Sequence, residues 1–359
     1  MPEPGYQNAF IDCIRVVVRC PHDTPIGGYI NIGVKNNGDG EIFRESASYA
    51  DVLGPHGHAL VRTYDLTGRQ SLDIKFCPGK YFQGHNAFAS GNLVGLVVAG
   101  VRDVVERLGL TLPEEEMARL LAGDVDLHEV HCTAMIDLGS ESAVENALYY
   151  IYRGRHQRLR GPGKHEGTPT FGTGGSHQLK FYNKHREMST GDRWGENYAD
   201  GLRDGVFDWT LGKLRVEVCL KRRKLRKLGL QKASSWSEET PGRIVREQLE
   251  LMRVNETAGL SPEAENRLTS AEYRVYQAWK SGADWKRMFK SSTSRKNYRR
   301  RLLKLGIDIS VPYQNGVSSN KGQQDVVPFV EIIERDFSPV PGFALGKEVY
   351  VEPEDDAKE

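Results

Sequence analysis

The chain has 359 residues and a formal net charge of +1 at pH 7. Its 38% hydrophobic and 27% charged residues are typical of a folded, soluble protein, and the length leaves room for two domains. The N-terminus lacks the basic start and apolar core of a signal peptide. The most apolar run, residues 93–108, contains Arg102 and Asp103 and is too short to span a bilayer. We therefore expect a cytoplasmic protein and exclude secreted and membrane-spanning classes.

The cysteines and the clustered charges narrow the class further. Five cysteines form no CxxC pair, which predicts buried, reduced thiols and no zinc motif. Residues 221–227 read Lys-Arg-Arg-Lys-Leu-Arg-Lys, and residues 295–304 hold six basic residues and no acid. Basic runs are usually solvated faces, but two of them in separate segments favour nucleic-acid binding. The tail, 346–359, is acidic and is expected to be disordered.

The N-terminal two thirds alternate between strand and helix patterns. Strands are predicted, in chain order, at residues 10–20, 29–34, 59–66, 71–76, 127–138, 179–184 and 214–218. Helices are predicted at residues 93–108, just after Pro113, and at 141–155, where Ser142 and Glu145 have capping-box spacing. A glycine-rich loop at 161–175 precedes the strand at 179–184, and 192–208 reads as a loop or partial helix. This order predicts an α+β fold, a mixed or antiparallel sheet with packed helices.

The pattern becomes helical after about residue 231. A charged helix at 241–255 and a polar stretch at 256–266 lead to three short helices. The first begins at the capping box of Thr269 and Glu272, Asp284 begins the second, and the third runs from 291–293 to a stop at Gly306.

These three helices resemble a helix-turn-helix unit whose third helix enters a DNA major groove. Its basic residues are the candidate DNA contacts: Arg295, Lys296, Arg299, Arg300 and Arg301. The alternative is a small bundle with a solvated face. We predict a catalytic domain at 8–230, a helical linker at 231–267, a helical DNA-binding domain at 268–345 and the tail at 346–359.

The strand at 179–184 carries the most informative pattern. Because side chains alternate along a strand, Lys180, Tyr182 and Lys184 share one face, and the lysines should favour the phenolate form of the tyrosine. Arg215 and Glu217 share a face in the strand at 214–218. A phenol among cations, beside a carboxylate that can hold a metal, suits attack on a phosphodiester. The alternative is a half-buried strand with solvent-reaching lysines.

A second pattern indicates a metal site. Glu129 and His131 share a face of the strand at 127–138, and Glu217 could supply a third ligand from another strand. Oxygen ligands combined with imidazole suit Mg²⁺ or Mn²⁺. A purely structural role for this pair remains the alternative.

A third pattern is the segment from Asp73 to Asn86, which includes Lys75 and ends in Gln-Gly-His-Asn. Gly84 permits a close backbone approach, and His85 and Asn86 could contact a phosphate. The alternative is a turn in which Gly and Asn only satisfy backbone geometry.

With these motifs in place, the chain resembles the replication initiators of filamentous bacteriophages, the gene II protein family. The resemblance runs in order from about residue 10 to residue 343. The motifs that carry it are Asp73-Ile74-Lys75, Gln83-Gly84-His85-Asn86, Tyr182 with Lys184, Arg215-Val216-Glu217, Val326-Val327-Pro328 and Asp336-Phe337.

The resemblance implies an endonuclease related in mechanism to the HUH (His, hydrophobe, His) enzymes. It would nick the plus strand at the double-stranded phage origin, start rolling-circle DNA replication in the host bacterial cytoplasm and rejoin the strand. Host helicase and polymerase are the implied partners. Tyr182 would be the nucleophile, assisted by Lys180, Lys184 and Arg215, and the metal ligands would be His131, Glu217, Glu129 and His85.

The chain departs from the family at one motif. Members carry Arg-hydrophobe-Asp where this chain has Glu129-Val130-His131. His131 would therefore replace the aspartate as ligand, and Glu129 reverses the charge of the arginine. Asn86 and Lys75 are further candidate DNA contacts. Two alternatives stay open: a non-catalytic origin-binding or repressor protein, and a metal nuclease that uses water.

Overall fold

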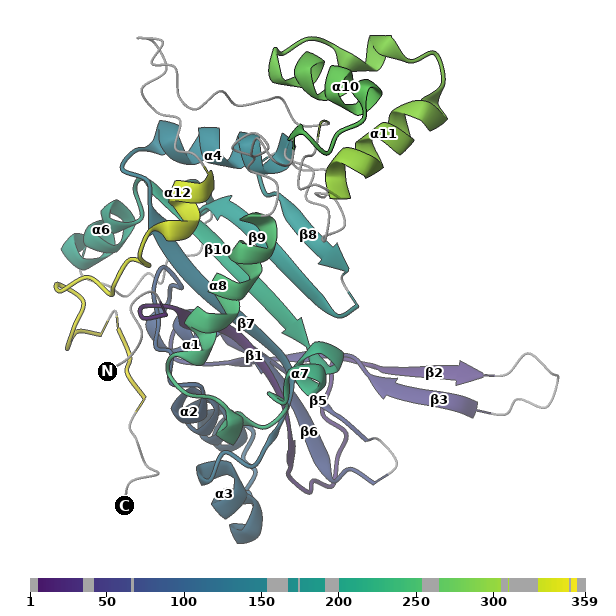
Figure 1. The fold of residues 1–359 in the computed structure, drawn as a ribbon. Coiled ribbons are helices and arrows are strands. Elements are labelled where there is room, and N and C mark those ends of the chain that lie inside the picture. The colour runs from purple at the N-terminus through teal and green to yellow at the C-terminus, as the bar shows by residue number, and fades with distance from the viewer. Residues whose placement is uncertain are drawn as a thin grey trace.

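The computed structural model describes residues 6–34, 42–65, 68–153, 167–173, 175–190, 200–253, 265–304, 309, 329–348 and 350–353. Within these residues eight strands form one sheet (Figure 1). Their spatial order is β4 (Ala50–Leu53), β5 (His58–Thr63), β6 (Ser71–Phe76), β1 (Phe10–Arg19), β7 (Asp126–Asp137), β10 (Lys213–Lys221), β9 (His177–Asn183) and β8 (Thr170–Thr173). Every described pairing is antiparallel, so the predicted α+β class is confirmed and the sheet is antiparallel, not mixed.

A separate ribbon of β2 (Ile30–Val34) and β3 (Ile42–Ala47) extends away from the sheet (Figure 1). The sequence predicted only the first of these two strands, and β4 and β8 were also missed. All three missed strands are short, from four to six residues, so they show little periodicity.

Helices cover the apolar face of the sheet. The covering helices are α2 (Leu93–Arg107), α4 (Glu141–Arg153) and α8 (Thr240–Arg253), and α12 (Phe329–Glu334) packs on α8. Gly100 allows α2 to lie close to the sheet, because a Cβ there would be 2.1 Å from the Phe76 ring. In β10 the side chains of Val216 and Val218 enter this core, so Arg215 and Glu217 must point to the opposite face. The alternation of the strands therefore separates an apolar face from a polar one.

Smaller helices lie between these elements. They are α1 (Pro78–Gln83), α3 (Glu114–Leu121), α5 (Lys184–Ser189), α6 (Asp200–Trp209), α7 (Arg222–Leu228) and the 3₁₀ turn η1 (Ala233–Ser235). The basic run at 221–227 is mostly α7. At α4 the backbone N–H of Ala143 donates to Ser140 Oγ at 3.1 Å, so Ser140, not Ser142, caps the helix. No described helix is long and apolar enough to cross a bilayer.

Segments assigned by sequence to the linker and the helical domain pack on the sheet. Residues 240–253 were expected in a linker, yet Ile244, Val245 and Leu249 of α8 are buried in the main core. Their helical spacing gives α8 one apolar side, which explains this packing. Phe337 forms a β-bridge with Ile136, so the chain after α12 also returns to the sheet. The domain limits themselves stay a prediction.

The remaining helices form a unit with its own core. It contains α10 (Ser270–Lys280), η2 (Trp285–Met288) and α11 (Ser292–Lys304) around the buried Tyr276, Trp285 and Leu302. The predicted capping box of Thr269 and Glu272 is present, and the Asp284 side chain accepts from the backbone N–H of Lys286. The C-terminal part is thus mainly helical. The predicted stop at Gly306, the Val326–Pro328 motif, residue 349 and residues 354–359 of the acidic tail lie outside the described residues.

Candidate functional site

His131 lies at the centre of the polar face, between two carboxylates. Its Nδ1 is 2.9 Å from Glu217 Oε1, and its Nε2 is 2.9 Å from Glu129 Oε1. Burial by itself would lower the pKa of His131, but hydrogen bonds with Cys219, Glu129 and Glu217 raise it well above the ordinary value. These contacts therefore favour the protonated imidazole. The two carboxylates around His131 thus stabilise a positive charge at the position where the sequence predicts a metal ion.

Among the described residues, two groups of side chains on this face could hold a metal ion. Asp12, His131 and Glu217 form the first, and Glu129, His131 and Cys219 form the second; within each group the ligand atoms lie within 4.8 Å of one another. Burial disfavours the charge on Glu129, but His131 and Lys75 outweigh it and lower its pKa to about 2. The pKa of Glu217 is likewise lowered by His131 and Lys180 despite its burial. Both carboxylates are therefore ionised near neutral pH.

Asp12 and Cys219 were not predicted as site residues. Asp12 is a single acid within the apolar, β-branched strand β1, and a charge in a central strand was the available signal. Cys219 follows Glu217 by two residues and so shares its face. Neither signal places the residue beside His131 until the pairing of the strands is known.

Tyr182 borders the same carboxylate. Its hydroxyl donates to Glu217 Oε2 at 3.3 Å, and Lys180 Nζ lies 2.8 Å from Glu217 Oε1. The sequence predicted that lysines would lower the pKa of this phenol. Instead burial raises it well above its usual value, Glu217 adds to the rise, and only Arg215 opposes it. Burial therefore favours the protonated phenol, and Lys180 pairs with Glu217 instead of the phenol oxygen.

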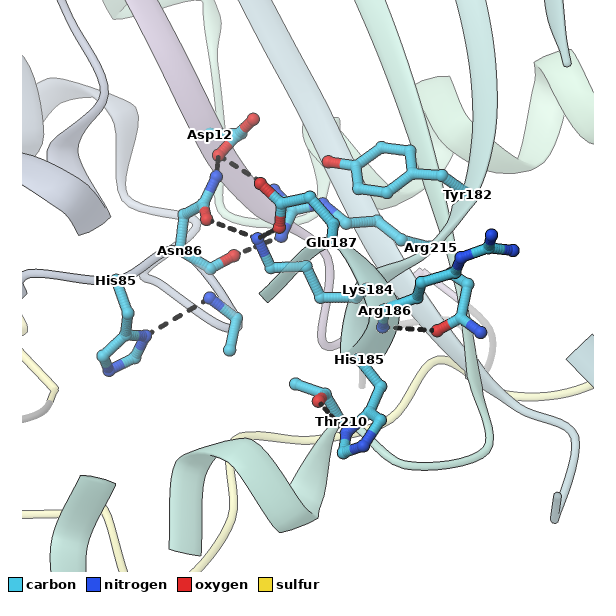
Figure 2. A network of polar contacts seen from close by, with 12 residues as sticks. Asp12, His85, Asn86, Tyr182, Lys184, His185, Arg186, Glu187, Thr210 and Arg215 are labelled. Carbon is cyan, nitrogen blue, oxygen red and sulfur yellow. Dashed lines mark hydrogen bonds and ion pairs between the residues drawn. The ribbon is translucent and has the colours of Figure 1, made fainter. Parts of the chain in front are cut away.

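Lys184 does not lie beside Tyr182 on a strand face. Strand β9 ends at Asn183, whose side chain accepts from the Arg186 backbone N–H and begins α5. Lys184 is buried; it donates to Asn86 Oδ1 at 2.7 Å and pairs with Glu187 (Figure 2). Burial, reinforced by Arg215, lowers its pKa to about 8.

Arg215 and Asn86 belong to the same buried network as Lys184 (Figure 2). Asn86 Nδ2 donates to Asp12 Oδ1 at 2.7 Å, and Arg215 Nη2 lies 2.9 Å from the same oxygen. Arg215 also donates to the Asn86 backbone oxygen, and its guanidinium lies 5.6 Å from the centre of the Tyr182 ring. The Arg215 side chain is fully buried. Both residues therefore position Asp12 and Tyr182, and neither presents a surface for a DNA phosphate.

His85 and Gly84 have local structural roles. His85 Nδ1 accepts from the Ala87 backbone N–H at 3.2 Å, and its ring packs edge-on against Phe88. In Figure 2 His85 points away from Asn86 and Lys184, and it belongs to neither metal-capable group. Gly84 ends α1 in the left-handed conformation, with φ of 67°. The turn interpretation of this segment therefore has the stronger support.

Lys75 and the helical basic residues differ in their exposure. Lys75 Nζ lies 2.7 Å from Glu129 Oε1, and its side chain is 31% exposed at the edge of the site. Arg295 donates to the Phe289 backbone oxygen, which fixes it within the helical unit. Among the α11 side chains that the structure describes, Lys296, Arg300 and Arg301 are exposed, whereas Arg299 is half-buried.

A pocket of about 590 Å³ opens beside Tyr182 and is also lined by Tyr149, Glu145 and Arg186. Tyr149 belongs to α4 and is exposed. The pocket therefore borders the tyrosine residue on one side, and the network around Arg215 lies on the other. Among the described residues, the polar face thus joins a tyrosine beside a pocket to a carboxylate–imidazole group that suits a divalent cation.

Comparisons with known proteins place the chain in a family. Residues 10–239 match the family described as replication-associated protein G2P N-terminal, and residues 264–349 match replication-associated protein G2P C-terminal. The replication-associated protein G2P of Enterobacteria phage I2-2 is 26% identical over 339 residues, which cover 92% of this chain and 95% of the relative. No solved structure matches the chain significantly. The chain belongs to the phage replication-associated protein G2P family, the gene II protein family.

Proposed function

We propose that this protein is a metal-dependent, site-specific endonuclease that nicks the plus strand at the double-stranded phage origin through Tyr182. Membership of the G2P family supports a role in starting phage replication. One observation carries the chemistry: the Tyr182 hydroxyl donates to Glu217, whose other oxygen lies 2.9 Å from His131. The candidate nucleophile and the candidate metal ligands thus share one carboxylate.

The donor set fits a magnesium or manganese ion. Asp12, His131 and Glu217 come from three adjacent strands and offer two carboxylates and an imidazole within 4.8 Å of one another. Hard oxygen donors combined with one imidazole suit these ions. When bound, the ion would polarise the scissile phosphate and stabilise its developing negative charge.

The protein residues would perform the remaining work. The Tyr182 oxygen attacks the phosphorus, and its proton leaves along the hydrogen bond to Glu217 Oε2. The bond from phosphorus to the 3′ oxygen breaks, and that oxygen takes a proton to become a free 3′-hydroxyl. Arg215 holds the tyrosine ring in place, and its positive charge favours the phenolate that forms on attack.

The product would be a 5′-phosphotyrosyl link that keeps the energy of the broken phosphodiester. A host polymerase can extend the 3′-hydroxyl while a host helicase separates the strands. A later 3′-hydroxyl can attack the phosphotyrosine and reverse the step, which would rejoin the strand.

The test is the Tyr182→Phe variant on supercoiled origin DNA with Mg²⁺. We expect loss of nicking and of the covalent protein–DNA adduct, with origin binding nearly unchanged, because only the nucleophilic oxygen is removed. Tyr149→Phe is the matched control, since Tyr149 lines the same pocket. It should nick normally. Adduct formed at a near-normal yield by Tyr182→Phe would refute the assignment, and wild-type nicking without any adduct would favour a nuclease that uses water.

A further inference from the structure

We propose that Glu129, His131 and Cys219 form a second cation site, which takes a thiophilic ion such as Zn²⁺ and thereby inhibits the enzyme. The site itself needs nothing from the proposed nicking chemistry. Only the inhibition rests on that proposal.

Three strand positions bring these donors together. Cys219 of β10 lies directly opposite His131 of β7 in the strand register, and Glu129 shares the β7 face with His131. Their ligand atoms all lie within 4.8 Å of one another. The cysteine spacing in the sequence predicts no zinc motif because the ligands come from neighbouring strands, which spacing along the chain cannot reveal.

The thiol decides which ion fits. A sulfur, an imidazole nitrogen and a carboxylate oxygen match the ligands of tetrahedral Zn²⁺, with water as the fourth ligand. Mg²⁺ and Mn²⁺ prefer oxygen donors and would use the Asp12–His131–Glu217 group. Binding of Zn²⁺ would displace two protons to solvent, one from the Cys219 thiol and one from Nε2 of the protonated His131. Glu129 has two oxygens, so it can bind the ion and keep its contact with Lys75.

The shared imidazole couples the two groups. Glu129 lies at Nε2 of His131 and Glu217 lies at Nδ1. A neutral imidazole that binds Zn²⁺ through Nε2 carries its proton on Nδ1 and donates it to Glu217. Nδ1 is then no longer a ligand for the first group. Zn²⁺ at the second group should therefore suppress nicking supported by Mg²⁺ or Mn²⁺.

The test of the site uses Co²⁺ as a spectroscopic probe on the full-length protein. A cobalt–thiolate bond produces a charge-transfer band in the near ultraviolet. We expect this band in the wild type and its loss in Cys219→Ser and Cys219→Ala. Cys132→Ala is the matched control, because Cys132 is adjacent to His131 but points into the apolar core. It should keep the band.

Zn²⁺ affinity provides a second measurement, by competition with a chromophoric chelator. We expect the Cys219 variants to bind Zn²⁺ about tenfold more weakly or worse, and Cys132→Ala to bind like the wild type. A band that persists without Cys219, or equal Zn²⁺ affinities, would overturn the proposal. Two substitutions at Cys219, each checked by thermal unfolding, separate ligand loss from misfolding.

Inhibition is measured separately, as the Zn²⁺ concentration that halves Mg²⁺-dependent nicking. Each rate is normalised to the same variant's rate without Zn²⁺. We expect this concentration to rise at least about tenfold in Cys219→Ala, in line with its weaker binding. Equal inhibition of both proteins would overturn the coupling. If the wild type does not nick at all, the proposed function fails, whereas the cobalt spectrum still decides whether the site exists.

Discussion

The charge state of individual residues on the polar face depends on their partners more than on their type. Tyr182 lies two residues from Lys180, yet Lys180 pairs with Glu217 and burial raises the phenol pKa. The pKa of His131 moves in the opposite sense to that of an ordinary buried histidine, because carboxylates lie at both ring nitrogens. A bound divalent ion would replace a proton of His131 as the positive charge that these carboxylates stabilise.

Removing a ligand from the Asp12–His131–Glu217 group should therefore abolish activity. We expect His131→Ala and Glu217→Gln each to lower nicking by several orders of magnitude, because both the affinity for the ion and the stabilisation of charge are lost. Mg²⁺ or Mn²⁺ titrations of the nicking rate measure this. Glu129→Gln should cost less, since Glu129 lies outside this group.

The exposed Glu115→Gln on α3 serves as the control and should match the wild type. Near-normal nicking by His131→Ala at ordinary metal concentrations would remove the imidazole from the ligand set. A metal-bound structure that places the ion away from Glu217 would remove that carboxylate from the ligand set.

Elements impose constraints that single residues do not reveal. Strand alternation correctly places Arg215 with Glu217 and Glu129 with His131, since both pairs lie within uninterrupted strands. The same rule fails for Lys184, because Asn183 ends β9 and begins α5. Strand β7 also has an irregularity opposite Arg15 and Val16 of β1, and His128 lies at that point, buried beside Tyr64.

The buried His128 should make stability depend on pH. Burial, helped by Arg222, lowers the pKa of His128 from 6.5 to about 4. Between those values the unfolded chain binds a proton that the folded protein does not, so this residue makes the fold less stable as the pH falls from 6.5 to 4. The full effect is at most roughly 3.5 kcal/mol, at about 1.4 kcal/mol per pKa unit.

Urea unfolding of the wild type and His128→Asn between pH 4 and 7 measures this contribution. We expect a shallower loss of stability on acidification in the variant. His131 contributes in the opposite direction, because its raised pKa stabilises the protein at low pH and this stabilisation is lost as the pH rises through the folded-state pKa. Both the wild type and His128→Asn contain His131, so the difference between their stability curves cancels its contribution.

His58→Asn, at an exposed position on β5, is the control and should follow the wild type. If the stability of His128→Asn changed with pH in parallel with that of the wild type, His128 would not titrate as stated.

At the scale of the whole molecule, the sheet with its helices and the α10–α11 unit have separate apolar cores. The segment after α12 packs on the sheet, although it follows the helical unit in the chain. The candidate chemistry lies on the sheet, and the exposed basic residues of α11 lie on the helical unit. Binding of duplex DNA and cleavage can therefore be tested apart.

The variant Lys296→Ala/Arg300→Ala should weaken binding to duplex origin DNA if α11 binds phosphates. Both residues are exposed, whereas Arg295 holds the Phe289 carbonyl and would confound the test. For every phosphate that the variant no longer neutralises, the slope of log affinity against log salt should fall by about one unit, because fewer counterions are released on binding. Affinities measured across a salt series give this slope.

Nicking of a short single-stranded origin oligonucleotide should survive in the same variant, because Tyr182 and the metal-capable groups lie on the sheet. Arg102→Ala, an exposed arginine on α2, is the control for a general loss of charge. Unchanged affinity and slope in the double variant would indicate that this face of α11 is simply solvated.

The sequence by itself determined the family, the α+β class and the strands that carry Tyr182, Glu217 and His131. These depend on local alternation and on motifs in chain order, which need no knowledge of the fold. Only the tertiary structure decided that Asp12 and Cys219 join His131, since strand order and register bring distant residues together. Only the tertiary structure showed that Lys184 and Asn86 are buried partners and that the Tyr182 pKa is raised. Burial and ion pairing are properties of the packed molecule, and they reverse what the neighbours along the chain suggest.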